Sequence, residues 1–125
     1  NRNIQIMVQS FSFSIGYPTG IDMIFDCRFL KNPNWVEDLK NLNGTDEAVK
    51  EYLNKDKSWA PFKKNLLQMI SIIIPAFERE GKSYLSIGLG CTGGQHRSVF
   101  VAEQLYNYLL DKNCDVKILH TILQR

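Results

Sequence analysis

The chain has 125 residues, a formal net charge of +2, and 44% hydrophobic and 22% charged residues. These values predict one globular domain and exclude a disordered chain, and so small a charge does not by itself indicate a nucleic-acid-binding protein. Three widely spaced cysteines favour a reducing cytoplasm and argue against a disulfide framework or a zinc site. No apolar run approaches the length of a membrane span, so we expect neither a membrane partner nor a bound metal. The start at Asn1 rather than Met suggests a processed product or a fragment.

Hydrophobic periodicity and turn signals predict eight elements in the order β, β, α, α, α, β, α, β. Helix-containing connections favour parallel strand pairing. We therefore expect residues 1–125 to form a single three-layer α/β domain, with a mostly parallel central sheet flanked by helices. The predicted strands cover residues 4–13, 21–29, 84–89 and 116–120. The predicted helices cover residues 33–40, with Asn32 as the N-cap and Asn43-Gly44 as the stop signal, a segment capped by Thr45, residues 58–79 with a kink at Pro75, and residues 96–112.

A glycine-rich run between the third predicted strand and the last helix is the strongest site signal. This run, residues 90–98, is named the anion loop here and contains the pattern Thr-Gly-Gly-x-His-Arg-Ser. Unpaired N–H groups and the dipole of the following helix attract an anion, and glycines let the backbone curl around it. Arg97 is a candidate bidentate clamp, and His96 titrates near neutrality. The candidate phosphate contacts in the loop are Thr92, Gly93, Gly94, His96, Arg97 and Ser98.

The same loop also matches a second pattern, the Cys-x5-Arg phosphate loop of cysteine-dependent phosphatases. In that interpretation Cys91 is a nucleophile and Arg97 holds the phosphoryl oxygens. Gly90 stands where those enzymes usually have histidine, and no segment clearly offers a general-acid aspartate. We therefore favour a domain without catalytic residues, in which Cys91 is a small buried residue, and keep the phosphatase as an alternative.

A second candidate segment covers residues 25–35. Asp26 and Arg28 share one face at the end of a predicted strand, so Arg28 is a second candidate anion clamp and Asp26 its orienting partner. An ordinary surface salt bridge is the alternative. We expect the aromatic side chains of Phe11, Phe13, Trp35, Trp59 and Tyr106 to be core residues rather than stacking platforms for bases.

The segments 9–11, 25–33 and 90–99, in this order and spacing, resemble the C-terminal domain of the RapZ family. The resemblance covers essentially the whole chain. It implies an RNA- and metabolite-binding domain of a longer protein whose N-terminal P-loop domain binds ATP or GTP. The sequence contains no Gly-x-x-x-x-Gly-Lys-Ser/Thr run, so no nucleotide cofactor is expected within these residues.

The resemblance also implies partners: a phosphorylated amino sugar such as glucosamine 6-phosphate, a small regulatory RNA, RNase E, and further copies of the same protein. Arg28 and Asn34 would face the sugar phosphate across from the anion loop, although family members often have histidine where Asn34 stands. A purely structural oligomerisation domain of a P-loop NTPase is a third interpretation. The implied RNA contacts are Arg28, Lys31, Arg97, Lys112, Lys117, His120 and Arg125.

Overall fold

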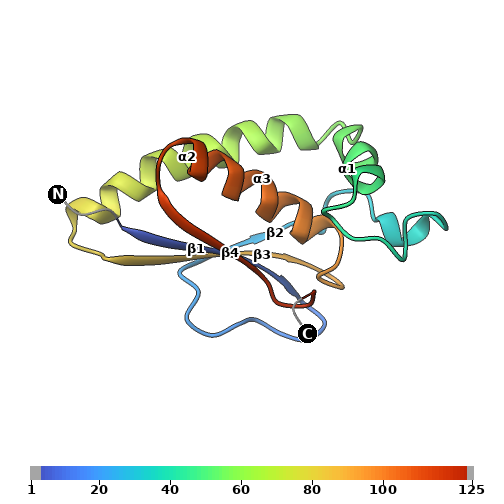
Figure 1. Ribbon diagram of the computed structural model, residues 1–125, viewed down its shortest axis with the longest axis horizontal. Coiled ribbons are helices and arrows are strands. Elements are labelled where there is room, and N and C mark those ends of the chain that lie inside the picture. The colour runs from blue at the N-terminus through green and yellow to red at the C-terminus, as the bar shows by residue number, and fades with distance from the viewer. Residues whose placement is uncertain (1–3, 124–125) are drawn as a thin grey trace.

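The computed structural model describes residues 4–123 and contains four strands, three α-helices and one 3₁₀ helix (Figure 1). The predicted order of elements is confirmed. In chain order the elements are β1 (Gln5–Ser12), β2 (Met23–Asp26), η1 (Pro33–Trp35), α1 (Glu47–Asn54), α2 (Trp59–Arg79), β3 (Tyr84–Cys91), α3 (Arg97–Asp111) and β4 (Asp115–His120).

The four strands form one parallel sheet in the order β2-β3-β1-β4. The connections from β2 to β3 and from β3 to β4 advance in the same direction across the sheet, so right-handed crossovers place α2 and α3 on the same face. The connection from β1 to β2 runs back, and its loop lies on the other face (Figure 1). The predicted α/β domain with a parallel sheet is confirmed, and the layer opposite the helices is the loop of residues 13–22.

The core lies between the sheet and the two long helices. In β3, Leu85, Ile87 and Leu89 are fully buried, and in α3, Leu105 and Leu109 are spaced to face the sheet. Each such side chain contributes about 1.5–3 kcal/mol through burial. This apolar packing fixes the N-terminus of α3 against the ends of the strands.

Aromatic rings cover the opposite face of the sheet. The rings of Phe11, Phe13 and Tyr17 meet edge to face, with centroids 5.0–6.2 Å apart. Gly90 makes room for them, because a Cβ there would lie 2.6 Å from both phenylalanine rings. The loop after β1 is therefore anchored beside the carboxyl end of β3.

Two helices differ from the sequence prediction, one in its length and one in its N-cap. Asn32 caps the first helix as predicted, with its Oδ1 accepting from the N–H of Asn34 at 3.0 Å, but this helix is only the short η1 because Val36 adopts an extended backbone. The next helix, α1, has Asp46 rather than Thr45 at its N-cap. The Thr45 hydroxyl instead donates to Asn43 Oδ1 at 2.6 Å.

The parallel pairing brings the two predicted site segments together. Asp26 at the end of β2 is in register with Gly90 near the end of β3, and the N–H of Cys27 donates to the Gly90 carbonyl at 2.8 Å. Loops at the carboxyl ends of parallel strands are the usual ligand-binding edge of such sheets. Residues 27–35 therefore lie beside the anion loop.

Candidate anion-binding site

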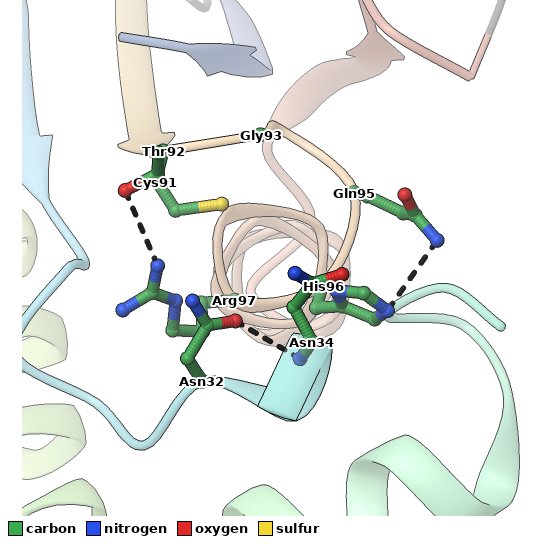
Figure 2. Close-up of a pocket in the computed structure, with 8 residues that line it drawn as sticks. All are labelled: Asn32, Asn34, Cys91, Thr92, Gly93, Gln95, His96 and Arg97. Carbon is green, nitrogen blue, oxygen red and sulfur yellow. Dashed lines mark hydrogen bonds between the residues drawn. The ribbon is translucent and has the colours of Figure 1, made fainter. Parts of the chain in front are cut away.

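A cavity of about 160 Å³ lies at the N-terminus of α3, between the anion loop and η1 (Figure 2). The Asn34 side chain extends from η1 toward the loop, and the Cys91 sulfur faces the loop from the end of β3 (Figure 2). Of the predicted sugar-phosphate contacts, Asn34 and four residues of the loop line this cavity. The lining residues are Asn32, Asn34, Cys91, Thr92, Gly93, Gln95, His96 and Arg97.

The anion loop is fastened to β1. Ser12 Oγ donates to the main-chain carbonyl of Thr92 at 2.6 Å. Gly94 has a φ of 71°, and a Cβ there would lie 2.5 Å from Ile122 and 3.0 Å from the Ser12 nitrogen. Both the conformation and the close packing therefore require glycine at position 94. Gly93, by contrast, faces open space.

Arg97 connects the anion loop to the segment after β2. Its guanidinium is buried, and Nη1 donates to the main-chain carbonyls of Arg28 at 2.8 Å and Leu30 at 3.1 Å. Nη2 makes a long contact of 3.5 Å with Thr92 Oγ1 (Figure 2). The two N–H groups of Nη1 therefore hold the fold, while Nη2 contacts Thr92, which lines the cavity together with Arg97.

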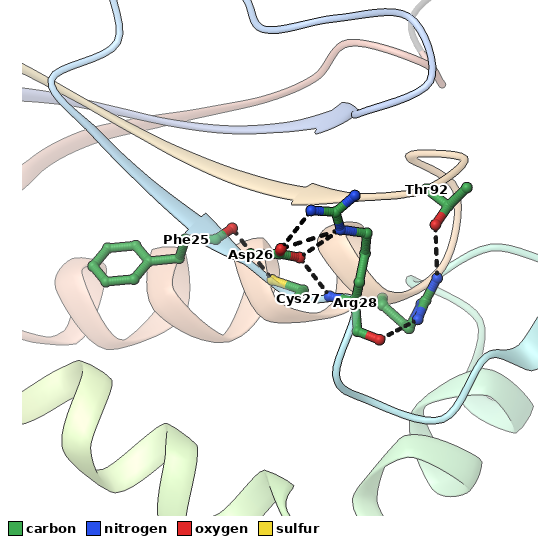
Figure 3. A network of polar contacts seen from close by, with 6 residues as sticks. Phe25, Asp26, Cys27, Arg28 and Thr92 are labelled. Atoms are coloured by element: carbon green, nitrogen blue, oxygen red, sulfur yellow. Dashed lines mark hydrogen bonds and ion pairs between the residues drawn. The ribbon is translucent and has the colours of Figure 1, made fainter.

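The Arg28 side chain lies outside the cavity and pairs with Asp26 (Figure 3). Nε donates to Oδ1 at 2.9 Å and Nη2 donates to Oδ2 at 2.6 Å. These hydrogen bonds lower the pKa of the Asp26 carboxyl. The guanidinium also lies 4.0 Å from the centroid of the Phe13 ring, a cation–π contact. Only the main-chain carbonyl of Arg28 reaches Arg97.

Cys91 and Ser98 form two hydrogen bonds across the base of the anion loop. The Cys91 thiol donates to Ser98 Oγ at 3.1 Å, and the N–H of Ser98 donates to Sγ at 3.3 Å. The Ser98 side chain is fully buried and does not line the cavity. Cys27 is buried nearby, and desolvation strongly raises its pKa, so it remains a thiol. Ser98 thus supports the loop from below.

His96 is a neutral hydrogen-bonding group. Gln95 donates both amide hydrogens, to the carbonyls of Lys40 at 2.9 Å and Leu42 at 2.6 Å. Gln95 thus has no amide hydrogen left for the nearby His96 Nε2. Because the Leu39 carbonyl can only accept, His96 Nε2 carries a proton and donates to it at 3.1 Å. Burial lowers the pKa of His96, so the ring is uncharged at pH 7. In this tautomer Nδ1 is an acceptor.

Gly44 supports the site, although sequence reasoning identified it only as a helix stop. Its N–H donates to the Gln95 carbonyl at 3.0 Å. A Cβ at this position would lie 2.4 Å from the His96 oxygen and 2.5 Å from the Phe100 nitrogen. Only glycine lets the loop before α1 approach the first turn of α3 this closely. The Asn43-Gly44 pair is the sole local signal, and it does not reveal this contact.

Asn32 and Trp35 also differ from their sequence interpretations. Asn32 was expected only to cap a helix, yet it also lines the cavity. The prediction that Trp35 is a core residue is wrong, because its side chain is 82% exposed. Trp35 ends the three-residue turn η1, which is too short to present an apolar face to the core.

The predicted RNA contacts lie at two ends of the domain. Arg28 and Lys31 follow β2, and Arg97 begins α3, so these three lie at the carboxyl edge of the sheet. Lys112 follows the last turn of α3, and Lys117 is the third residue of β4, at the opposite end.

His120 is buried between two other polar side chains. Its Nδ1 lies 2.7 Å from Ser10 Oγ and its Nε2 lies 2.7 Å from Glu103 Oε2. Both ring nitrogens are engaged within the fold. Arg125 lies outside the described residues.

Within residues 4–123, no group of three or more His, Cys, Asp or Glu side chains is placed to hold a metal ion. None of the helices in this range combines the length and the apolar character needed to cross a membrane.

The fold and the site define a parallel α/β domain with a polar cavity at a helix N-terminus. The chain belongs to the RapZ C-terminal domain family, whose model matches residues 4–124. It is 51% identical over 122 residues to a nucleotide-binding protein of Cereibacter sphaeroides, covering 98% of this chain and 40% of that protein. A nucleotide-binding protein of Ruegeria pomeroyi is 44% identical over 98% of this chain and 43% of its own length. One of Citrifermentans bemidjiense is 44% identical over 94% of this chain and 41% of its own length. The chain thus spans about two fifths of these relatives.

Proposed function

We propose that this domain binds the phosphate of a phosphorylated amino sugar, such as glucosamine 6-phosphate, in the cavity at the N-terminus of α3. The observation that carries the proposal is that Thr92 and Arg97, whose Oγ1 and Nη2 lie 3.5 Å apart, both line the cavity at the first turn of α3. The helix dipole and free N–H groups favour an anion there. No carboxylate lines the cavity among the described residues, so no negatively charged side chain there repels a bound anion.

The sugar ring would meet neutral polar groups. Asn32 and Asn34 offer carboxamides from η1, and His96 offers the acceptor Nδ1. Such groups can bind hydroxyls without adding charge. The cavity is smaller than the pockets of drug-sized ligands, which suits a small polar metabolite whose phosphate enters first.

We further propose that the domain binds small regulatory RNA and acts as an RNase adaptor within a longer, nucleotide-binding, cytoplasmic and homo-oligomeric protein. Membership of the RapZ C-terminal domain family supports this role. Lys31 places exposed positive charge at the carboxyl edge of the sheet, near the half-exposed Arg28, whose charge is paired with Asp26. In this account the domain performs no catalysis, and a P-loop domain elsewhere in the protein would bind ATP or GTP.

Calorimetry with glucosamine 6-phosphate and with glucosamine tests the metabolite proposal. The phosphorylated sugar is expected to bind and the free sugar is not. Thr92→Val is expected to weaken binding by roughly 10- to 100-fold, the value of a lost hydrogen bond to a charged phosphate. Asn34→Ala is expected to weaken it by roughly 2- to 10-fold, the value of a lost hydrogen bond to a neutral sugar hydroxyl. Thr19→Val and Asn65→Ala are matched controls at exposed positions away from the cavity. Equal affinity for both sugars, or no effect of the cavity variants, would overturn the assignment.

The salt dependence of RNA binding tests the second role. Contacts through phosphates predict affinity that falls steeply between low and moderate salt. Lys31→Ala is expected to reduce the slope of log affinity against log salt by about 1, whereas Lys64→Ala on α2 leaves it unchanged. RNA binding that is indifferent to salt would contradict this role.

A further inference from the structure

Trp35 is the most exposed large hydrophobic side chain in residues 4–123, with 82% of its surface accessible. A single exposed apolar residue is ordinary on a protein surface. Tryptophan, however, presents a large rigid ring whose burial against a ligand is strongly favourable. The surroundings of Trp35 in the fold therefore indicate whether its exposed ring has a function.

Trp35 is held on a rigid turn beside the cavity. It directly follows Asn34, and both Asn34 and Asn32 line the cavity. The N–H of Trp35 donates to the Asn32 carbonyl at 3.1 Å, and the buried Pro33 anchors the turn between them. The indole is thus attached one residue from the cavity wall, on a backbone that needs little further ordering when a ligand binds.

The size of the indole indicates a ring-shaped ligand rather than a protein. A stable protein interface buries about 800 Å² on each partner, whereas one aromatic side chain supplies about 150–250 Å². A nucleobase matches one indole face, and stacking of this kind tolerates any base. The adjacent cavity offers the matching partner for a phosphate attached to the same nucleoside.

We propose that Trp35 is a stacking platform for the base of a nucleoside 5′-phosphate whose phosphate lies in the cavity. The unit is either a free mononucleotide or part of a single-stranded RNA. This inference rests on the anion-binding role of the cavity proposed above. Lys31 is exposed four residues before Trp35 and supplies positive charge for a neighbouring phosphate of a strand.

Calorimetry with AMP, ribose 5-phosphate and a short oligoadenylate tests the platform. Trp35→Ala is expected to weaken binding of adenine-containing ligands by about 5- to 100-fold. It should leave ribose 5-phosphate, which lacks the base, unchanged. Trp35→Phe keeps a stacking ring and should restore most of the loss, and Tyr84→Ala removes an exposed aromatic ring at the far end of β3 as a control. AMP should also quench tryptophan emission in the wild type, because Trp59 is buried and Trp35 is accessible.

The outcomes separate this inference from the function on which it rests. If ribose 5-phosphate binds and Trp35→Ala changes no adenine-containing ligand, the platform alone is overturned. Equal weakening of ribose 5-phosphate and AMP also overturns it. If the wild type binds neither phosphate, the anion-binding role fails too. A loss seen with AMP identifies a mononucleotide site, and a loss confined to the oligoadenylate identifies a strand site; both support stacking. A change in sedimentation of Trp35→Ala without ligand would show a protein contact instead and overturn the proposal.

Discussion

The Arg97 guanidinium donates a hydrogen bond of 2.8 Å to the main-chain carbonyl of Arg28. This bond joins the N-terminus of α3 to the segment after β2, the two parts of the chain that the sequence marks as candidate site segments. The Arg28 side chain turns the other way, to Asp26 and Phe13. One arginine therefore holds the wall of the cavity, while the other forms a half-exposed ion pair beside it.

Arg97→Ala is expected to lower the free energy of unfolding by about 2–4 kcal/mol, because the carbonyls of Arg28 and Leu30 lose their donors in a buried setting. Arg79→Ala, at the exposed end of α2, should change it by no more than about 0.5 kcal/mol. Urea denaturation followed by circular dichroism measures both. Equal stability of the two variants would show that Arg97 does not fasten the loop. Because of this structural role, loss of ligand binding in Arg97→Ala is not by itself evidence of contact with the ligand.

Gly94→Ala and Gly93→Ala form a matched pair within one loop. Alanine at position 94 must adopt a φ of 71° and meets Ile122 at 2.5 Å, whereas position 93 has open space. The left-handed backbone alone costs about 1–2 kcal/mol. We expect Gly94→Ala to lower the melting temperature clearly and Gly93→Ala to leave it nearly unchanged. The reverse order, measured by calorimetric melting, would mean that the loop has a different conformation.

Cys91→Ser distinguishes a binding site from a phosphatase. The described residues that line the cavity include no carboxyl group that could serve as a general acid, and the Cys91 thiol donates to Ser98 Oγ. We therefore expect no turnover of an aryl phosphate by the wild type and unchanged affinity for glucosamine 6-phosphate in Cys91→Ser. Turnover by the wild type that disappears in Cys91→Ser would establish the enzymatic alternative.

His96 predicts a loss of stability in mild acid. Burial, together with the neighbouring Arg97, lowers its pKa below the ordinary value of 6.5. The unfolded chain therefore binds the proton first as the pH falls, and stability declines below about pH 6.5. The lowered pKa of Asp26 acts in a separate window, because its contribution is lost only below its unfolded value of 3.8. The urea concentration at the midpoint of unfolding should fall for the wild type as the pH is lowered from 7.5 to 5. It should fall less for His96→Gln. Parallel declines would contradict this account.

Local patterns in the sequence predict the elements of the fold well, and they also predict that residues 25–35 and 90–98 lie together. The apolar strand before Gly90 and the amphipathic run after His96 define the strand, loop and helix that form the cavity. The spacing of Asp26 and Arg28 on one face of an extended segment likewise predicts that they face each other. Parallel pairing then follows from the helical connections and brings the two segments to one edge.

Contacts between distant segments could not be predicted in the same way. The sequence does not reveal that Gly44 packs against the first turn of α3, or that Arg97 donates two N–H groups to main-chain carbonyls. Trp35 is exposed in a turn of three residues where the sequence predicts a longer helix. The burial of His120 depends on Ser10 and Glu103, which lie far away in the chain. Each of these features is set by tertiary packing.

The most direct test of the central claim is an amide ¹H–¹⁵N NMR titration of the domain with glucosamine 6-phosphate. If the phosphate binds at the N-terminus of α3, the largest shifts will fall on the amides of residues 92–98 and on Asn32 and Asn34 across the cavity. Glucosamine without phosphate should leave these signals in place. Shifts that cluster at the opposite end of the sheet, around Lys112 and Lys117, or no shifts at all, would contradict the account.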